Sequence, residues 1–271
     1  MSELSKNGTE IMSKGYKQQR YKQYLFVIHE LTSRELKRRY ARSYLGVVWS
    51  LLNPLLMMAV TTFVFSYMFS KSIENYPVYY LIGTTIYALF HTATEHSMTT
   101  LVDNKNLLFK AKLPKYTFVL SRLCTALVNY VYSLITLGVI MFLFKIRVTW
   151  TMLLIIPVIL LVFMLSIGIG FILSIVYVFF ADIKYLYGVF CRLLVFCSAI
   201  FYPLSSLPLE AQKILGFNPI FLAINIARNV LQYGKAGSEE EWLKLITFSL
   251  GFFICGLLIF KKFEGNVMRK I

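Results

Sequence analysis

The sequence is short of acidic residues and of cysteines. It has 13 Asp and Glu against 28 Lys and Arg, which gives a net charge of +15. Cys124, Cys191, Cys197 and Cys255 all lie in apolar stretches and show no CxxC spacing. This pattern indicates neither a disulfide framework nor a zinc site, so we expect the cysteines to be packing residues and the chain to hold no metal.

The sequence also lacks a phosphate-binding G-x-x-x-x-G-K-[ST] motif. Gly234 and Lys235 are the nearest match, but the upstream glycine and the following hydroxyl residue are missing. We therefore expect no ATP bound by this device and no cofactor in this chain. A cleavable signal peptide is not expected either, because residues 1–22 are polar and the first apolar run starts too far into the chain.

Charged residues are scarce over most of the chain, and apolar residues are abundant. Hydrophobic residues make up 58% of the sequence, and the mean hydropathy is +0.65. Long apolar runs indicate membrane-spanning helices, because a helix satisfies its own backbone groups inside hydrocarbon. We predict an all-α polytopic membrane protein with six spans, at residues 45–70, 78–101, 117–144, 151–180, 184–202 and 242–262.

The distribution of basic residues predicts the orientation. Lys and Arg are enriched in cytoplasmic loops, so the positive charge need not indicate nucleic acid, and we expect none as a partner. With the N-terminus inside, the predicted inner segments 1–44, 101–122, 181–192 and 261–271 hold 21 of the 28 basic residues. We therefore expect both termini in the cytoplasm.

The segment before the first span divides into two parts. Residues 1–21 show no periodicity, which indicates a mobile cytoplasmic tail. Residues 22–44 have apolar side chains at helical spacing followed by basic ones, which predicts an amphipathic helix on the inner leaflet. This helix is interpreted either as an anchor for anionic lipid or as an anchor that also docks a partner.

The first span opens with an unusual combination of residues. LGVVWSLLNP at residues 45–54 follows Arg39 and Tyr40 and contains Leu45, Gly46, Trp49 and Pro54. Trp49 alone would fit an aromatic belt at the headgroups, and Pro54 is expected to kink or loosen the helix. Together they resemble the opening of the type-2 ATP-binding-cassette export permeases. Within that family, the segment is most similar to the teichoic-acid, O-antigen and capsular polysaccharide exporters.

The resemblance continues in two further segments. NLLFKAKLP at residues 106–114 is similar to the cytoplasmic loop that carries the family's coupling helix, which docks on an ATPase subunit. A plain basic loop is the alternative. The resemblance implies coupling through Asn104, Asn106, Leu107, Leu108, Phe109, Lys110, Lys112 and Pro114. FYPLSSLP at 201–208, then Asn218–Pro219 and Ala227–Arg228, resemble the family's outer segment, which implies short amphipathic or re-entrant helices between spans five and six.

The second predicted span contains several polar residues. His91 and Glu95 share a helix face in the second span, with His96 beside them, but H-E-x-x-H spacing is absent. A polar patch is favoured over a proton relay or a metalloenzyme. Tyrosines were considered as the lining of a wet passage for sugars, with packing as the alternative for each. The candidates are Tyr80, Tyr87, Tyr132, Tyr177 and Tyr202.

These observations predict a transport subunit rather than an enzyme. The resemblance implies a type-2 transmembrane domain over residues 45–265 and a homodimer with two ATPase subunits that hold ATP and Mg. It implies export of a lipid-linked polysaccharide or teichoic-acid polymer across a bacterial cytoplasmic membrane. The alternatives are an exporter of drugs or small lipids, or an intramembrane enzyme using His91, Glu95 and His96.

Overall fold

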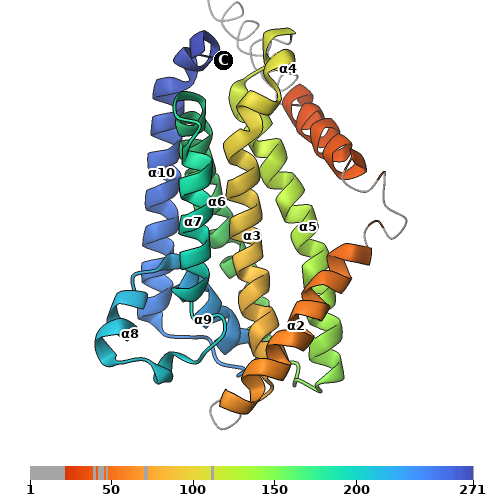
Figure 1. Ribbon diagram of the computed structural model, residues 1–271, viewed down its shortest axis with the longest axis vertical. Coiled ribbons are helices and arrows are strands. Elements are labelled where there is room, and N and C mark those ends of the chain that lie inside the picture. Colours follow the sequence, from red (N-terminus) through yellow and green to blue (C-terminus); the bar gives the residue numbers. More distant parts are fainter. Residues whose placement is uncertain are drawn as a thin grey trace, which may run out of the picture.

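The computed structural model describes residues 22–38, 41, 46, 48–69, 73–110 and 113–270. All the regular structure in these ranges is helical, so the predicted all-α class is confirmed (Figure 1). The predicted tail 1–21 and the motif residues Arg39, Tyr40, Leu45 and Lys112 lie outside the described residues.

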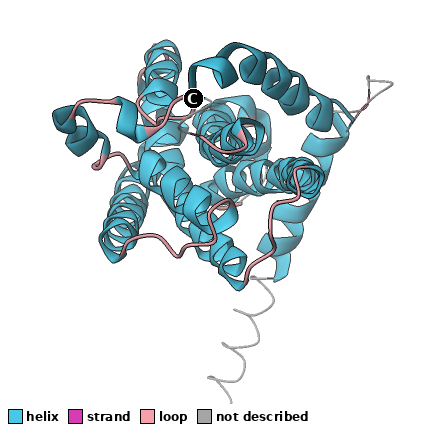
Figure 2. Ribbon diagram, turned by 90° about the horizontal axis from the view of Figure 1, so that it is seen from below, coloured by secondary structure: helices cyan, strands magenta, loops and turns pink. Residues whose placement is uncertain are grey.

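The bundle is built around α3 (Tyr76–Asp103). This helix packs against α5 (Lys115–Leu143) and α6 (Ile155–Phe179), and α6 packs along α10 (Glu239–Lys270). Figure 2, seen from below, shows these helices side by side as a bundle without strands in the described part. The central position of α3 explains why most of its apolar side chains are buried although it is less apolar than its neighbours.

Two helices lie at the side of this bundle. The helix at residues 22–38 and α2 (Val48–Phe69) follow each other in the chain, and α2 packs on α3 and α5 (Figure 1). Helix α2 continues through Pro54, which lies one turn and a half after its start. Most side chains of α2 are exposed or half-buried, so this helix is less tightly packed than α3 or α6.

Local sequence explains several helix ends. Asn218 begins α9 (Pro219–Leu231), because its Oδ1 accepts the Ile220 N–H at 2.9 Å. Pro219 has no N–H, so it needs no acceptor in the first turn. Helix α10 starts with Glu239, Glu240 and Glu241 and ends with Arg269 and Lys270. This charge order is favourable for the helix dipole.

Four helical stretches are long and apolar enough to cross a bilayer. They are Val48–Met68, Lys115–Leu143, Trp150–Phe179 (α6 with the preceding 3-10 turn) and Glu239–Lys270. A fifth results if α8 (Leu209–Leu215) and α9, bent by 98° at their junction, count as one broken span. The chain is therefore a multi-pass membrane protein, and this coarser part of the prediction is confirmed.

The predicted second and fifth spans differ from these four. Helix α3 covers the second with 28 residues but carries many polar side chains, whereas α7 (Ile183–Phe196) covers the fifth with only 14 residues. The chain leaves the helical conformation after Phe196 although the apolar sequence continues to 202. Tertiary hydrogen bonds, described below, make this early end possible.

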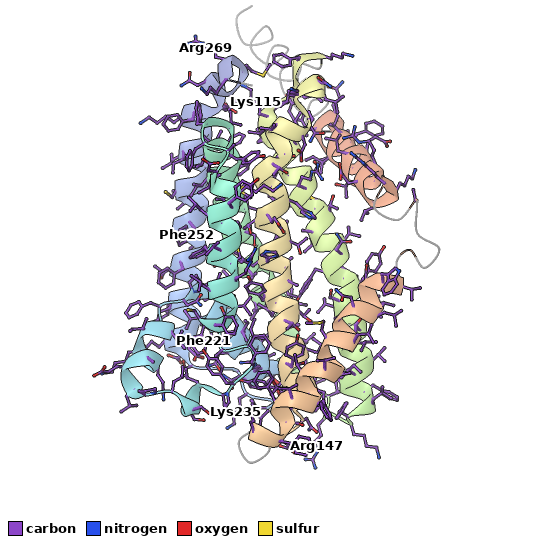
Figure 3. All side chains as sticks on the ribbon, viewed as in Figure 1. Lys115, Arg147, Phe221, Lys235, Phe252 and Arg269 are labelled. Carbon is purple, nitrogen blue, oxygen red and sulfur yellow. The ribbon has the colours of Figure 1, made fainter. Side chains whose placement is uncertain are left out.

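The two ends of the bundle carry different segments. Helix α4 (Lys105–Lys110), the start of α5 and the end of α10 lie at one end, where Figure 3 labels Lys115 and Arg269. The loops that contain Arg147 and Lys235 lie at the opposite end, near α8 and α9.

Candidate functional site

Helix α4 presents one apolar side chain to the bundle and another to solvent. Leu108 is 6% exposed and lies in a cluster with Leu101 and Phe118, whereas Phe109 is 58% exposed. Successive residues of a helix point about 100° apart, so a short helix can be anchored by one and display the next. Leu107 is half-buried, and Asn106 and Lys110 are exposed on the same short helix.

The junction between α3 and α4 is organised by Asn104. Its Nδ2 donates to the Thr100 carbonyl at 2.8 Å, and its own carbonyl accepts the N–H groups of Leu107 and Leu108, each at 3.0 Å. Asn104 therefore closes one helix and starts the next, which fixes the direction of α4. After α4 the chain reaches Pro114, whose carbonyl accepts the Thr117 N–H at 3.1 Å at the start of α5.

A polar cavity of about 670 Å³ lies beside this junction. The helix at 22–38, the end of α3, α4 and the start of α5 all contribute to it. Arg122 donates to Glu35 at 2.7 Å and approaches Asp103 at 3.5 Å, and Arg34 donates to the Asn104 Oδ1 at 3.1 Å. Asn104, Asn106 and Leu107 of the predicted coupling residues line this cavity. Glu35, Asp103 and Arg122, which also line it, were not predicted as site residues.

A second, smaller groove lies between α2, α3 and α5. Its volume is about 350 Å³, and Trp49, Pro54 and Tyr80 of the predicted residues line it. Asn53, Asn129, Thr84, Thr92 and Ser133 add amides and hydroxyls to the lining, which contains no charged residue in the described part of the chain. A neutral surface of rings, hydroxyls and amides suits contacts with sugar hydroxyls and C–H faces.

The five predicted tyrosines occupy different surroundings. Tyr80 and Tyr87 are seven residues apart and share a face of α3, and the Tyr87 hydroxyl donates to the Cys191 carbonyl of α7 at 2.7 Å. Tyr177 packs near the same part of α7, in a cluster with Cys191. Tyr202 donates to the Phe196 carbonyl at 2.6 Å, and Tyr132 is half-buried on α5. The structure thus places Tyr87 and Tyr177 beside Cys191 of α7, Tyr202 at the end of α7, and Tyr80 in the groove between α2, α3 and α5.

His91 and Glu95 form a pair on α3. His91 Nδ1 lies 3.8 Å from Glu95 Oε2, with both side chains partly exposed, and the His91 ring stacks on Tyr87 at 5.7 Å between centroids. Groups of three or more His, Cys, Asp or Glu side chains suited to a metal are absent from the described residues. The pair alone fits a polar patch.

Residues 197–202 form a non-helical segment whose carbonyls are bonded by side chains from other helices. Arg228 is 2% exposed and donates to the carbonyls of Ala199 at 2.9 Å and Ile200 at 3.0 Å. The carbonyls of Cys197, Phe201 and Tyr202 accept from Asn218, Tyr76 and Tyr79 at 2.9, 2.9 and 2.8 Å. In the sequence, Arg228 was named only as part of a motif. An arginine inside the apolar run that forms α9 is the signal that could have identified it as a buried polar contact.

Comparison with known proteins relates this arrangement to transporters. Residues 27–232 match the family of ABC-2 type transporters. An O-antigen export system permease protein, RfbA of Myxococcus xanthus, is 30% identical over 84% of this chain and 88% of its own length. RfbA of Klebsiella pneumoniae is 26% identical over 89% of this chain and 93% of its own length.

A relative named for a different polymer shows a similar degree of likeness. The polysialic acid transport protein KpsM of Escherichia coli is 25% identical over 89% of this chain and 95% of its own length. The family match extends from the helix at 22–38 to the end of α9, and so covers α4 and the groove. With its helical multi-pass fold, this chain belongs to the ABC-2 type transporter family.

Proposed function

We propose that this protein is the permease subunit of an ATP-driven exporter that moves a lipid-linked polysaccharide, or a related polymer such as teichoic acid, across a bacterial cytoplasmic membrane. The observation that carries the proposal is the way in which α4 is held at one end of the bundle. This helix is anchored by buried Leu108 and displays Phe109 at the basic end of the bundle. The names of the relatives, which are export and transport proteins for O-antigen and polysialic acid, support this choice of cargo.

Six crossings with both termini in the cytoplasm are part of this proposal. Helices α2, α3, α5, α6 and α10 provide five of them, and α7 with the segment at 197–202 provides the other. α8 and α9 then form short amphipathic or re-entrant helices at the outer surface. The basic residues near α4 and at the end of α10 support a cytoplasmic position for that end.

The transporter is proposed to contain two copies of this chain and two ATPase subunits. ATP and Mg belong to the ATPase, because this sequence lacks a phosphate-binding loop. Exposed Phe109, flanked by Lys105 and Lys110, is suited to an apolar pocket with an acidic rim on that partner. The predicted coupling residues from Asn104 to Pro114 act there, and Trp49 and Pro54 of the first-span motif help to line the groove.

The groove, which Tyr80 lines, and the other predicted tyrosines are proposed as part of the cargo's path. Contacts of about 0.5–1.5 kcal/mol per aromatic ring are weak enough for a sugar chain to keep moving. Tyr80, Tyr87, Tyr132, Tyr177 and Tyr202 remain the candidates. An exporter of drugs or small lipids is the second function considered, since the groove is small and neutral.

Depletion of the protein is expected to trap its cargo. Because synthesis of the lipid-linked glycan continues when export stops, the glycan should accumulate on the cytoplasmic side of the membrane. Extracted lipid-linked glycan can be quantified after treating intact cells with an external glycosidase, and a protected fraction at least several-fold larger than in undepleted cells is expected. An unchanged glycan distribution together with altered drug efflux would instead support the small-molecule exporter.

Cysteine labelling is expected to report the proposed orientation. In a variant without the native cysteines, Arg147→Cys and Lys235→Cys should react with an impermeant thiol reagent applied outside, since both positions lie on exposed loops at the same end. Lys110→Cys and Lys262→Cys, at the other end, should react only after permeabilisation. Labelling of Lys110→Cys in intact cells would reverse the orientation.

A further inference from the structure

The helix at 22–38 is attached to both sides of α4. Upstream of α4, Arg34 donates to the Oδ1 of Asn104 at 3.1 Å, where α3 passes into α4. Downstream, the Thr32 hydroxyl donates to the Ser121 carbonyl of α5 at 3.2 Å. The rings of Tyr24 and Tyr116 meet edge to face, with centroids 6.3 Å apart. The junction before α4 and helix α5 after it are therefore both in contact with the helix at 22–38.

Arg122 is the residue that joins these attachments. It stands on α5, pairs with Glu35 of the helix at 22–38 at 2.7 Å and approaches Asp103, the last residue of α3, at 3.5 Å. The Arg122 and Glu35 side chains are only 16% and 15% exposed. A guanidinium presents several N–H donors in a fixed plane, so it can bond two carboxylates in defined directions, which a lysine ammonium cannot do equally well.

The helix at 22–38 is also the described helix that comes before α2 in the chain. Helix α2 begins at Val48, and its first turns supply Trp49, Asn53 and Pro54 to the polar groove. Since α2 is packed less tightly than the other long helices, a displacement of its first turns meets less resistance from the bundle.

We propose that Arg122 is a positioning residue that makes the helix at 22–38 and α4 move as one body, so that a push on α4 reaches α2 and changes the groove. This inference rests on the proposed function, in which an ATPase subunit pushes α4. The pair of Arg122 with Glu35 provides most of the linkage, because it is short and largely shielded from water. Asp103 contributes less, because its contact is longer and its side chain is half-exposed.

The test compares ATP hydrolysis with glycan export in the complete transporter reconstituted in lipid vesicles. Arg122→Ala and Glu35→Gln are expected to lower export at least tenfold while ATP hydrolysis stays within about twofold of the unmodified complex. Arg122→Lys should retain intermediate export, and Asp103→Asn should change it by less than about twofold. Arg147→Ala, in an exposed loop at the opposite end, is the matched control and should have no effect.

A covalent tether gives a readout that loss of stability would not produce. In the variant without native cysteines, Glu35→Cys with Arg122→Cys should export as poorly as Arg122→Ala. A short bifunctional thiol reagent that joins the two positions should then restore export, because a tether replaces the ion pair. The inference is overturned if the tethered complex stays inactive, or if hydrolysis and export fall together in proportion to folded protein.

One more variant, at Phe109, separates this inference from the proposed function. Phe109→Asp places a charge on the exposed side chain of α4 without touching the Arg122 contacts, and it should disrupt docking of the ATPase. If Phe109→Asp leaves coupled export intact, the proposed role of α4 fails. If Phe109→Asp abolishes coupling while Arg122→Ala and Glu35→Gln export normally, only the role of Arg122 fails.

Discussion

Alanine at Gly168 or Gly256 is expected to disrupt the packing of α6 against α10. A Cβ on Gly168 would lie 2.6 Å from the backbone nitrogen of Phe253 and closer still to the Phe252 carbonyl. A Cβ on Gly256 would lie 2.6 Å from the Cα of Gly168. These neighbours are backbone atoms, so they cannot rotate away as a side chain would, and the two helices must separate.

The expected cost is about 3 kcal/mol, at the upper end of what overpacking costs, because the clash is with a helix backbone. The apparent melting temperature in detergent and the yield of folded protein measure it. Gly251→Ala and Gly265→Ala are matched controls on α10, since a Cβ at either position has nothing within 4 Å. We expect both to be neutral or slightly stabilising, because alanine favours a helix over glycine. Equal melting temperatures for Gly168→Ala and Gly251→Ala would contradict this close crossing.

Replacing Arg228 with methionine is expected to destabilise the end of the bundle that carries α8 and α9. Arg228 donates to the carbonyls of Ala199, Ile200 and Tyr79, and its guanidinium carbon lies 3.4 Å from the centre of the Tyr79 ring. Methionine fills similar space but donates no hydrogen bond. Each buried carbonyl left without a donor costs about 1–3 kcal/mol. We therefore expect Arg228→Met to lower the melting temperature more than the same substitution at an exposed arginine does. Export should also be reduced.

Three further variants isolate the cause. Arg228→Lys keeps the charge but bonds fewer carbonyls, so its melting temperature should fall between those of Arg228→Met and the unmodified protein. Gly83→Ala should also destabilise, because a Cβ there would lie 2.8 Å from a terminal nitrogen of Arg228. The control Arg147→Met alters an exposed arginine and should be silent. If Arg228→Met is as stable as Arg147→Met, the carbonyls of 199–200 do not depend on this side chain.

The early end of α7 shows why one predicted boundary differed. The apolar sequence continues through residue 202, so hydrophobicity alone extends the helix that far. The structure ends the helix at Phe196 because donors from Tyr76, Tyr79, Asn218 and Arg228 satisfy the carbonyls that follow. Non-helical backbone is tolerated at membrane depth only when other groups supply such bonds. These donors come from distant parts of the chain, so no local pattern predicts them.

The candidate site divides in a similar way. The pattern at residues 104–114 resembles the family's coupling loop, which implied a short helix before Pro114, and α4 lies there. The same pattern did not distinguish Leu108, which is buried, from its neighbour Phe109, which is exposed. The direction of α4 relative to the bundle decides this, and it depends on the bonds of Asn104 and on packing against α5.

The sequence by itself determined the all-helical membrane class, the main apolar helices and the resemblance to export permeases, because apolar run length, charge by segment and short motifs are local properties. Only the tertiary structure decided which polar residues meet. Arg122 pairs with Glu35 across 87 positions of the chain, and Arg228 reaches the backbone of α3 and of the segment after α7. Such pairs follow from how helices cross and rotate against one another, which is set by the packing of the whole bundle.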